Sequence, residues 1–331
     1  MSEREITAPV DLCTPDGRLN RDAVGWTRHP LHGTAVPGWG RTKRWEYWGV
    51  MTPTVFVGIT VSSLDYAGVE AVYVLERGSG RERVHEAVVP LARGVVLPEQ
   101  CGTGRAAAYA KDLRIELDEV ASGTRLRASA PGAEVDVVAA LPDGHERMGV
   151  VVPWSPKRFQ YTVKDIGRPV SGSVVLDGVR TDVAGPTSFA VLDHGRGRWP
   201  YSMRWNWGAG HAVVDGRAVG VQVGGLWTDG TGSTENALVL DGVVHKESAT
   251  LAWEYDASDW LRPWRIRSAD GRVDLTFSPE HERVARTNLL VVANETHQCF
   301  GTWAGWMSTD DGERVAVDGV QGWAEEARNR W

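Results

Sequence analysis

The chain has 331 residues, of which 42% are hydrophobic, and a formal net charge of −7 at pH 7. This length exceeds that of a typical domain, so we expect two domains, or two halves that share one large core. The acidic balance and the scattered arginines exclude a broad basic surface, so we expect no nucleic-acid partner. Sixteen Trp against seven Tyr and five Phe supply large indole surfaces for a core, an interface or a ligand site.

The cysteines and the amino terminus bear on the cellular compartment. Cys13, Cys101 and Cys299 are odd in number and far apart, which predicts neither a disulfide framework nor a thiolate metal site. The polar first residues do not resemble a signal peptide, and no apolar run approaches the roughly 18 residues of a membrane span. We therefore expect a cytoplasmic protein.

The first half of the chain reads as strands. Residues 1–40 are rich in Pro and Gly and predict an irregular arm. From Lys43, a long run of aromatic and β-branched residues interrupted by Pro53 predicts two strands or one bent strand. Short strands separated by Gly-containing turns follow as far as residue 152. This pattern predicts an antiparallel meander, which we assign to a first domain at residues 41–155.

The prolines Pro153 and Pro156 suggest the domain boundary, because two prolines do not fit inside a central strand. Strand patterns resume after them and predict a second domain at residues 156–331. Helices are expected only at 106–113 and 323–330. Asp-Gly pairs between apolar runs predict tight hairpins at Asp177-Gly178, Asp215-Gly216, Asp241-Gly242, Asp270-Gly271 and Asp311-Gly312. The fold class is therefore all-β, with two antiparallel barrels or sandwiches.

The densest collection of reactive groups lies between Val191 and Gly210. We expect a loop over residues 193–198 and a strand from Trp199 onward. The two-residue period of that strand separates an aromatic face from a polar one. The aromatic face carries Tyr201, Met203, Trp205 and Trp207, and the polar face carries Ser202, Arg204 and Asn206. This is the pattern of a pocket wall, and equally that of an ordinary half-buried strand.

Carboxylates near aromatic residues are the candidate acids and bases. Asp193 and His194 are neighbours, so on a strand they would point to opposite faces and need partners from elsewhere. Burial would favour the protonated form of Asp193, which could then donate a proton. The alternative, equally weighted, is that Asp193 caps a turn while His194 packs. Glu235 beside Asn236 could supply a second carboxylate, although turn capping explains it better.

Glu46 is a further carboxylate candidate, because aromatic residues surround it in the sequence. An ion pair with Arg44 would explain it equally well. The histidines show no spacing typical of metal ligands. Phosphate-binding loops, GxSxG, HExxH, SxxK and EF-hand motifs are absent from the sequence. We expect neither a metal nor another cofactor.

Several stretches together closely resemble the DUF2804 family over roughly Trp45 to Trp331. They read KRWEYWGVMTP, LDYAGV, VVPWSPKRFQYTVKD, LDHGRGRWPYSMRWNWGAG, GGLWTDGTGSTENALVLDG, PWRIRS, VDLTFSP and GWAEEARNRW. More remotely, that family is similar to calycin-like double-barrel proteins, including AttH-type proteins and carotenoid 1,2-hydratases. The resemblance implies two lipocalin-like barrels packed together around a cavity for an apolar substrate. It also implies that Asp193, within the hydratases' aromatic-x-Asp-His run, protonates an alkene, although Val191 replaces the aromatic residue.

These arguments predict an enzyme without a cofactor, of the hydratase or cyclase type, acting on an apolar or isoprenoid-like molecule at the barrel junction. The alternatives are a carrier of a hydrophobic molecule and a glycosidase-like or carbohydrate-binding protein. The oligomeric state is open. The expected catalytic residues are Asp193, His194, Tyr201 and Glu235, and the expected substrate-binding residues are Glu46, Tyr47, Trp199, Arg204, Trp205, Asn206, Trp207 and Asn236.

Overall fold

The computed structural model describes residues 3–289 and 292–331. It is an all-β protein whose two large sheets curl into a nearly closed barrel and a half-barrel. The chain divides into two compact units, Ile6–Arg198 and Met1–Glu5 with Trp199–Trp331. This division falls at residues 198 and 199 rather than at the expected 155 and 156, and the first five residues belong with the carboxyl-terminal unit.

The Ile6–Arg198 unit holds the strands up to β15 and one short 3-10 turn, η1 (Arg21–Ala23). The strands are β1 (Val10–Asp11), β2 (Trp26–Thr27), β3 (His32–Gly33), β4 (Lys43–Met51), β5 (Val55–Ser63), β6 (Ala67–Glu76), β7 (Arg81–Pro90), β8 (Arg105–Ala110), β9 (Leu113–Val120), β10 (Gly123–Ala130), β11 (Ala133–Ala140), β12 (Met148–Ser155), β13 (Arg158–Leu176), β14 (Val179–Val183) and β15 (Phe189–Arg198).

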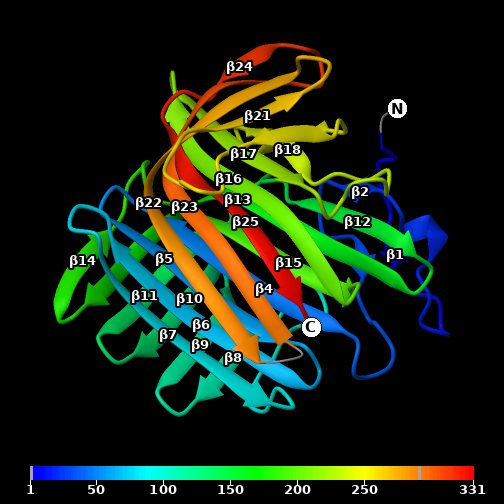
Figure 1. Cartoon of the computed structure of the whole chain (residues 1–331), viewed down its shortest axis with the longest axis horizontal. Coiled ribbons are helices and arrows are strands. Elements are labelled where there is room, and N and C mark those ends of the chain that lie inside the picture. The colour runs from blue at the N-terminus through cyan, green and yellow to red at the C-terminus, as the bar shows by residue number, and fades with distance from the viewer. Residues whose placement is uncertain (1–2, 290–291) are drawn as a thin grey trace. The chain divides into compact units, whose positions relative to one another are not determined.

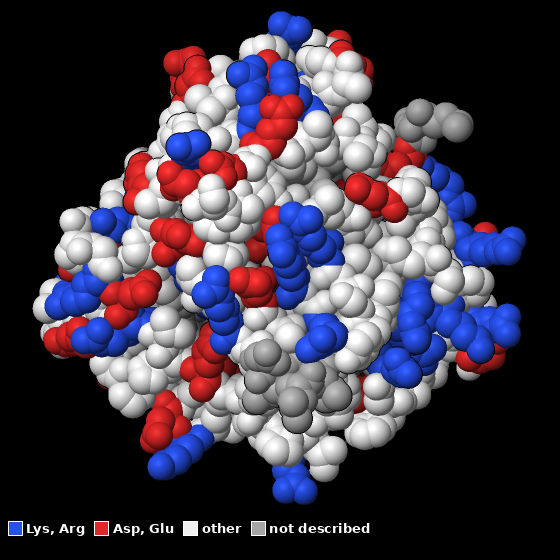
Figure 2. Space-filling view, viewed as in Figure 1, with Lys and Arg blue, Asp and Glu red and all other residues white. Residues whose placement is uncertain are grey.

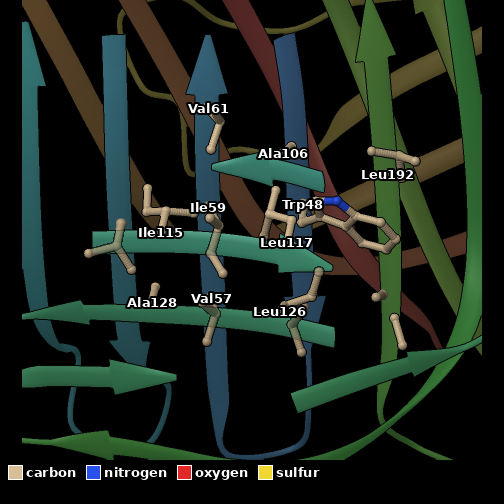
Figure 3. Close-up of a cluster of buried hydrophobic side chains, with 14 of the residues drawn as sticks. Trp48, Val57, Ile59, Val61, Ala106, Ile115, Leu117, Leu126, Ala128 and Leu192 are labelled. Carbon is tan, nitrogen blue, oxygen red and sulfur yellow. The ribbon is translucent and has the colours of Figure 1, made fainter. Parts of the chain in front are cut away.

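One sheet of thirteen strands organises this unit, with the order β7-β6-β5-β4-β15-β13-β11-β10-β9-β8 and with β12 and β14 also paired to β13. Period-two alternation gives its inner face Val, Ile, Leu and Ala side chains, which form one buried cluster. In Figure 3, β8 to β10 cross over β4 and β5, and Ile59, Ile115 and Leu126 fill the space between them. We call the face that carries this cluster the inner face.

The Trp199–Trp331 unit holds ten strands in one sheet. The order is β19-β18-β17-β16-β25-β23-β22-β21-β20, with β24 paired to β23, and Figure 1 shows β22, β23 and β25 side by side. The strands are β16 (Ser202–Val214), β17 (Arg217–Gly225), β18 (Asn236–Leu240), β19 (Val243–Glu247), β20 (Leu251–Glu254), β21 (Trp264–Ser268), β22 (Val273–Leu289), β23 (Val292–Ser308), β24 (Arg314–Ala316) and β25 (Val320–Arg330).

Three of the expected Asp-Gly hairpins have the backbone that the sequence predicts. Asp177, Asp215 and Asp241 have φ of 50°, 49° and 52°, and the glycine after each is also left-handed. Two successive left-handed residues define the type I′ turn, whose twist suits adjacent antiparallel strands. These turns join β13 to β14, β16 to β17 and β18 to β19.

Three local predictions are wrong. Residues 193–198 are not a loop but the second half of β15, and the two expected helices are strands, β8 and β25. Ala, Glu and Arg in these segments favour helices in isolation, but pairing on both sides overrides that weak preference. β25 pairs with β16 on one side and with β23 on the other.

The charged surface agrees with the sequence composition. Figure 2 shows Lys and Arg beside Asp and Glu over much of the face in view. Within residues 3–289 and 292–331, no helix combines the length and apolar character needed to cross a membrane.

Candidate functional site

Strand β15 sends its side chains alternately to the two faces of its sheet. His194 and Arg196 share the inner face with Leu192, whereas Asp193 and Gly195 lie on the outer face. The sequence DHGRGR thus places its glycines on one face and its basic residues on the other. Asp193 and His194 therefore belong to two different environments.

On the outer face, strand register brings chemical groups of three strands together. Lys164 of β13 and Tyr47 of β4 lie directly across from Asp193. In the next row, Thr162 and Trp45 flank Gly195 in the same way. The result is a polar and aromatic patch, which we call the Asp193 face.

The Asp193 carboxylate accepts from three donors. Thr162 Oγ1 lies 2.8 Å from its Oδ1, and Trp45 Nε1 lies 3.2 Å from its Oδ2. The Lys164 ammonium forms an ion pair with Oδ1 at 3.2 Å. The Asp193 side chain is 14% exposed, so these contacts act in a partly desolvated setting. The arrangement favours a carboxylate that accepts a proton over a carboxyl group that donates one.

Gly195 makes room for the indole that contacts Asp193. A Cβ at this position would lie 2.2 Å from two carbon atoms of the Trp45 ring system. The Trp45 ring therefore lies against the Gly195 backbone, and its Nε1 reaches the Asp193 carboxylate two residues away along β15. The absence of a side chain at Gly195 thus allows Trp45 Nε1 to take its position beside Asp193.

On the inner face, His194 pairs with Glu46. His194 Nδ1 lies 3.3 Å from Glu46 Oε1, and the imidazole is fully buried. Burial lowers the pKa of His194 to about 4, and the nearby Arg196 charge acts in the same direction, while Glu46 opposes both. The imidazole is therefore neutral near pH 7. Because the Glu46 carboxylate accepts, Nδ1 carries the proton and Nε2 is an acceptor.

In the Trp199–Trp331 unit, the polar side of β16 meets a carboxylate on β25. Arg204 lies 2.5 Å from Glu326 Oε2, and the Tyr255 hydroxyl donates to the same oxygen. Asn206 Nδ2 donates to the Tyr255 hydroxyl at 3.1 Å. Burial acts to raise the pKa of Glu326, but hydrogen bonds from Arg204, Tyr255 and Arg328 outweigh it and lower that pKa. The expected polar face of this strand therefore exists.

The opposite side of β16 belongs to a group of indoles. Trp199 stacks on Trp227 with ring centroids 5.3 Å apart, and its edge meets the rings of Trp205 and Trp331. Trp227 Nε1 donates to the buried Glu235 at 2.7 Å. Glu235 thus lies beside an aromatic cluster of its own unit.

The other predicted residues have structural partners or are exposed. Trp207 donates to Gln222 at 2.9 Å, and Asn236 accepts from the Gly224 amide and donates to the Ala249 carbonyl. Tyr201 precedes β16 and is 51% exposed. Asp193, His194, Glu46 and Tyr47 lie in the Ile6–Arg198 unit, and the remaining candidates lie in the other unit.

Sequence reasoning missed Trp45, Thr162 and Lys164. Thr162 and Lys164 are two residues apart, so they share a face wherever a strand includes both, and this spacing is visible in the sequence. The pairing of β13 with β15 could not be predicted from the sequence, since register depends on contacts between separate segments of the chain.

The geometry bears on two alternative chemistries. Glu46 and Asp193 lie on opposite faces of one sheet, so they cannot form the facing pair of carboxyl groups that a glycosidase needs. Among residues 3–289 and 292–331, no group of three or more His, Cys, Asp and Glu side chains is arranged to hold a metal ion.

Comparisons with known proteins agree with this architecture. The family described as a domain of unknown function, DUF2804, matches residues 3–331. A protein described as AttH from Nitrosomonas europaea superposes with a TM-score of 0.56 at 14% identity, covering 86% of this chain and 92% of its own. Kievitone hydratase from Nectria haematococca gives a TM-score of 0.53 at 10% identity, covering 88% of this chain and 89% of its own. Among curated proteins, none matches the sequence. At these identities, the structural similarity establishes the fold.

Proposed function

The chain belongs to the DUF2804 family, and from that premise we propose that it is a cofactor-independent enzyme of the hydratase or cyclase type, acting on an apolar small molecule. The observation that carries the proposal is the Asp193 carboxylate, fixed by three donors beside the rings of Trp45 and Tyr47. A proton-exchanging group next to an aromatic wall suits chemistry at an alkene. The fold shared with kievitone hydratase is consistent with this reaction class.

The contacts of Asp193 favour an order that begins with proton acceptance. In hydration of a polarised alkene, the water oxygen bonds to one alkene carbon while Asp193 takes a proton from that water. The protonated Asp193 then returns the proton to the other carbon, so the product gains one hydrogen and one hydroxyl. Lys164 and Thr162 hold the carboxylate in place throughout. In a cyclase, the same carboxylate would remove and return a proton on the substrate itself.

Deuterium incorporation tests this proposal. Kievitone and a panel of isoprenoid alkenes conjugated to a carbonyl group, which polarises the alkene, are incubated in D2O with the wild-type protein, with Asp193→Asn and with Asp182→Asn. Asp182 is the control because its side chain is 78% exposed and lies away from the Asp193 face. We expect the wild type and the control to add deuterium to one compound, and Asp193→Asn to lose at least a hundredfold of that rate. Equal rates for wild type and Asp193→Asn would refute the proposal.

A carrier is the second candidate, because the three contacts of Asp193 would also suit a purely structural role. In that case Asp193→Asn lowers the free energy of unfolding. A panel compound then binds with unchanged mass and takes up no deuterium. The same experiment thus separates the two functions.

A further inference from the structure

The inner face of the Ile6–Arg198 unit carries a polar band across five adjacent strands. Strand pairing places Thr27, Gly149, Val163, His194 and Glu46 side by side in one row. The next row contains Val151, Tyr161 and Arg196. A polar band inside an otherwise aliphatic core requires partners for its donors and acceptors.

Several atoms of this band and its surroundings are buried without a hydrogen-bond partner among the described residues. They are Thr27 Oγ1, His32 Nδ1, Arg147 Nε, Tyr161 Oη, His194 Nε2 and Arg196 Nε. Thr27, His32, Tyr161, His194 and Arg196 are each no more than 1% exposed. A buried polar atom without a partner costs free energy, and such atoms are rare in native proteins. These six atoms therefore mark a region where a polar molecule would supply the missing partners.

Both signs of charge meet in this region, because the charges of Arg147 and Arg196 act there together with those of Glu46 and Asp165. Arg196 is buried, yet its hydrogen bonds go only to the backbone carbonyls of Trp45, Gly195 and Pro98. Within the described part of the chain, neither Arg196 nor Arg147 forms an ion pair with a carboxylate. A buried cation without a carboxylate partner is unusual, because desolvation of the charge is then poorly offset. Burial lowers the pKa of Arg196 to about 10, with Glu46 acting against this change.

These groups converge on the Tyr161 hydroxyl. A Cβ at Gly149 would lie 2.5 Å from Thr27 Oγ1 and 3.0 Å from Tyr161 Oη, so both hydroxyls lie over this glycine. The His32 ring is 4.6 Å from the Tyr161 ring. Arg196 lies directly across from Tyr161 on the neighbouring strand. Burial raises the pKa of Tyr161, and the Arg147 and Arg196 charges oppose that rise.

We propose that this region, the Tyr161 site, binds a small organic acid through its carboxylate. A carboxylate presents two oxygens with about four acceptor positions, which match N–H groups of Arg196 and Arg147 and the hydroxyls of Tyr161 and Thr27. The site lies on the inner face, whereas Asp193 lies on the outer face, so the inference does not depend on the proposed reaction.

One loop covers the Tyr161 site. Residues 98–104 connect to it because Arg196 donates to the Pro98 carbonyl at 2.6 Å and the Arg147 guanidinium lies against Gly102. Gly102 and Gly104 have φ of 75° and 68°, and Gln100 and Gly102 are exposed on either side of the buried Cys101. This loop is the segment whose displacement would admit the acid.

The test uses carbon-13 formate and acetate, titrated into the full-length protein at constant ionic strength and followed by NMR. The variants are Tyr161→Phe, which removes only the hydroxyl, and Arg147→Gln. The second variant removes a guanidinium group whose Nε has no hydrogen-bond partner within the described part of the chain. Arg93→Gln is the matched control, since Arg93 is exposed and equally charged. We expect saturable binding to the wild type and the control, and at least tenfold weaker binding to both other variants.

Three results would overturn the inference. They are a wild type that saturates with neither formate nor acetate, binding that persists unchanged in both Tyr161→Phe and Arg147→Gln, and chloride that competes as well as an equal concentration of acetate. Tyr161→Phe also keeps the test valid if Arg147→Gln folds poorly, because no hydrogen bond of the fold is lost with that hydroxyl. In the absence of an acid, Tyr161→Phe is expected to unfold no more easily than the wild type.

Discussion

Among single residues, Gly195 has a clear structural effect. Because it has no side chain, the Trp45 ring can lie against β15 and donate to Asp193. The sequence indicated that Asp193 and His194 would separate onto two faces if the strand extended so far, and β15 does extend that far. The close approach of the Trp45 ring to Gly195 was not predictable, because a glycine in a strand is also explained by a bulge or a turn.

Gly195→Ala should therefore destabilise the protein and disturb the Asp193 face. The added Cβ would lie 2.2 Å from ring atoms of Trp45, so the ring or the strand must move, at a cost of about 1–3 kcal/mol. Urea unfolding measures this change. Gly78→Ala is the control, since a Cβ there meets nothing within 4 Å, and we expect it to stay within about 0.5 kcal/mol of the wild type. Equal free energies of unfolding for Gly195→Ala and Gly78→Ala would show that the Trp45 ring does not need the space left by Gly195.

At the scale of whole elements, β16 shows where a sequence pattern predicts the structure correctly, and β25 shows where it fails. The alternation of β16 was predictable, and so were three type I′ hairpins, because both signals are local. β25 was mistaken for a helix, since WAEEARNR contains good helix formers and its strand character comes from β16 and β23 on its two sides. The Asp193 face needs β15 to pair with β13 and with β4, and Trp45 of β4 lies 148 positions from Asp193 in the sequence, so no local pattern encodes it.

The pairing of β16 with β25 should respond to acid through Glu326. Its pKa is lowered in the folded protein, so its stabilising contribution is present above about pH 4.5 and is lost as the pH falls through the lowered pKa. Glu326→Gln should lower the free energy of unfolding by about 1–3 kcal/mol at pH 7 and by less in acid. Glu254→Gln, at a position 59% exposed, should show no such difference. Unfolding curves between pH 7 and pH 3 measure both variants, and parallel pH profiles for Glu326→Gln and wild type would contradict this role.

At the scale of the whole molecule, the chain begins in the unit in which it ends. Met1–Glu5 belong with Trp199–Trp331. Glu3 attaches this segment to that unit through a buried ion pair with Lys246 at 2.6 Å. Glu3 also accepts from the Thr234 amide at 3.1 Å and from the Thr234 hydroxyl at 2.7 Å. An irregular arm was predicted for residues 1–40, but composition carries no information about a partner so distant along the chain.

Glu3→Gln should destabilise the Trp199–Trp331 unit, because it leaves the Lys246 ammonium buried without its carboxylate. Burial already lowers the pKa of Lys246, and Glu3 is the main group opposing that change. Loss of one partner of a buried pair typically costs about 3–5 kcal/mol. Hydrogen exchange should accelerate in β18 and β19 more than in β9 and β10. Glu313→Gln, whose side chain is 64% exposed, is the control, and an exchange pattern identical to that control would rule out the anchoring role of Glu3.

The Glu3–Lys246 pair also sets an order of events during synthesis on the ribosome. Glu3 is made early, and its partner follows 243 residues later. At about 5–20 residues per second, the first segment waits roughly 12 to 50 seconds for Lys246. Ile6–Arg198 is complete before that moment and can fold in the meantime. A gene cut at the junction would therefore yield an amino-terminal product that holds the whole Ile6–Arg198 unit, and a carboxyl-terminal product that lacks Glu3, the partner of its Lys246.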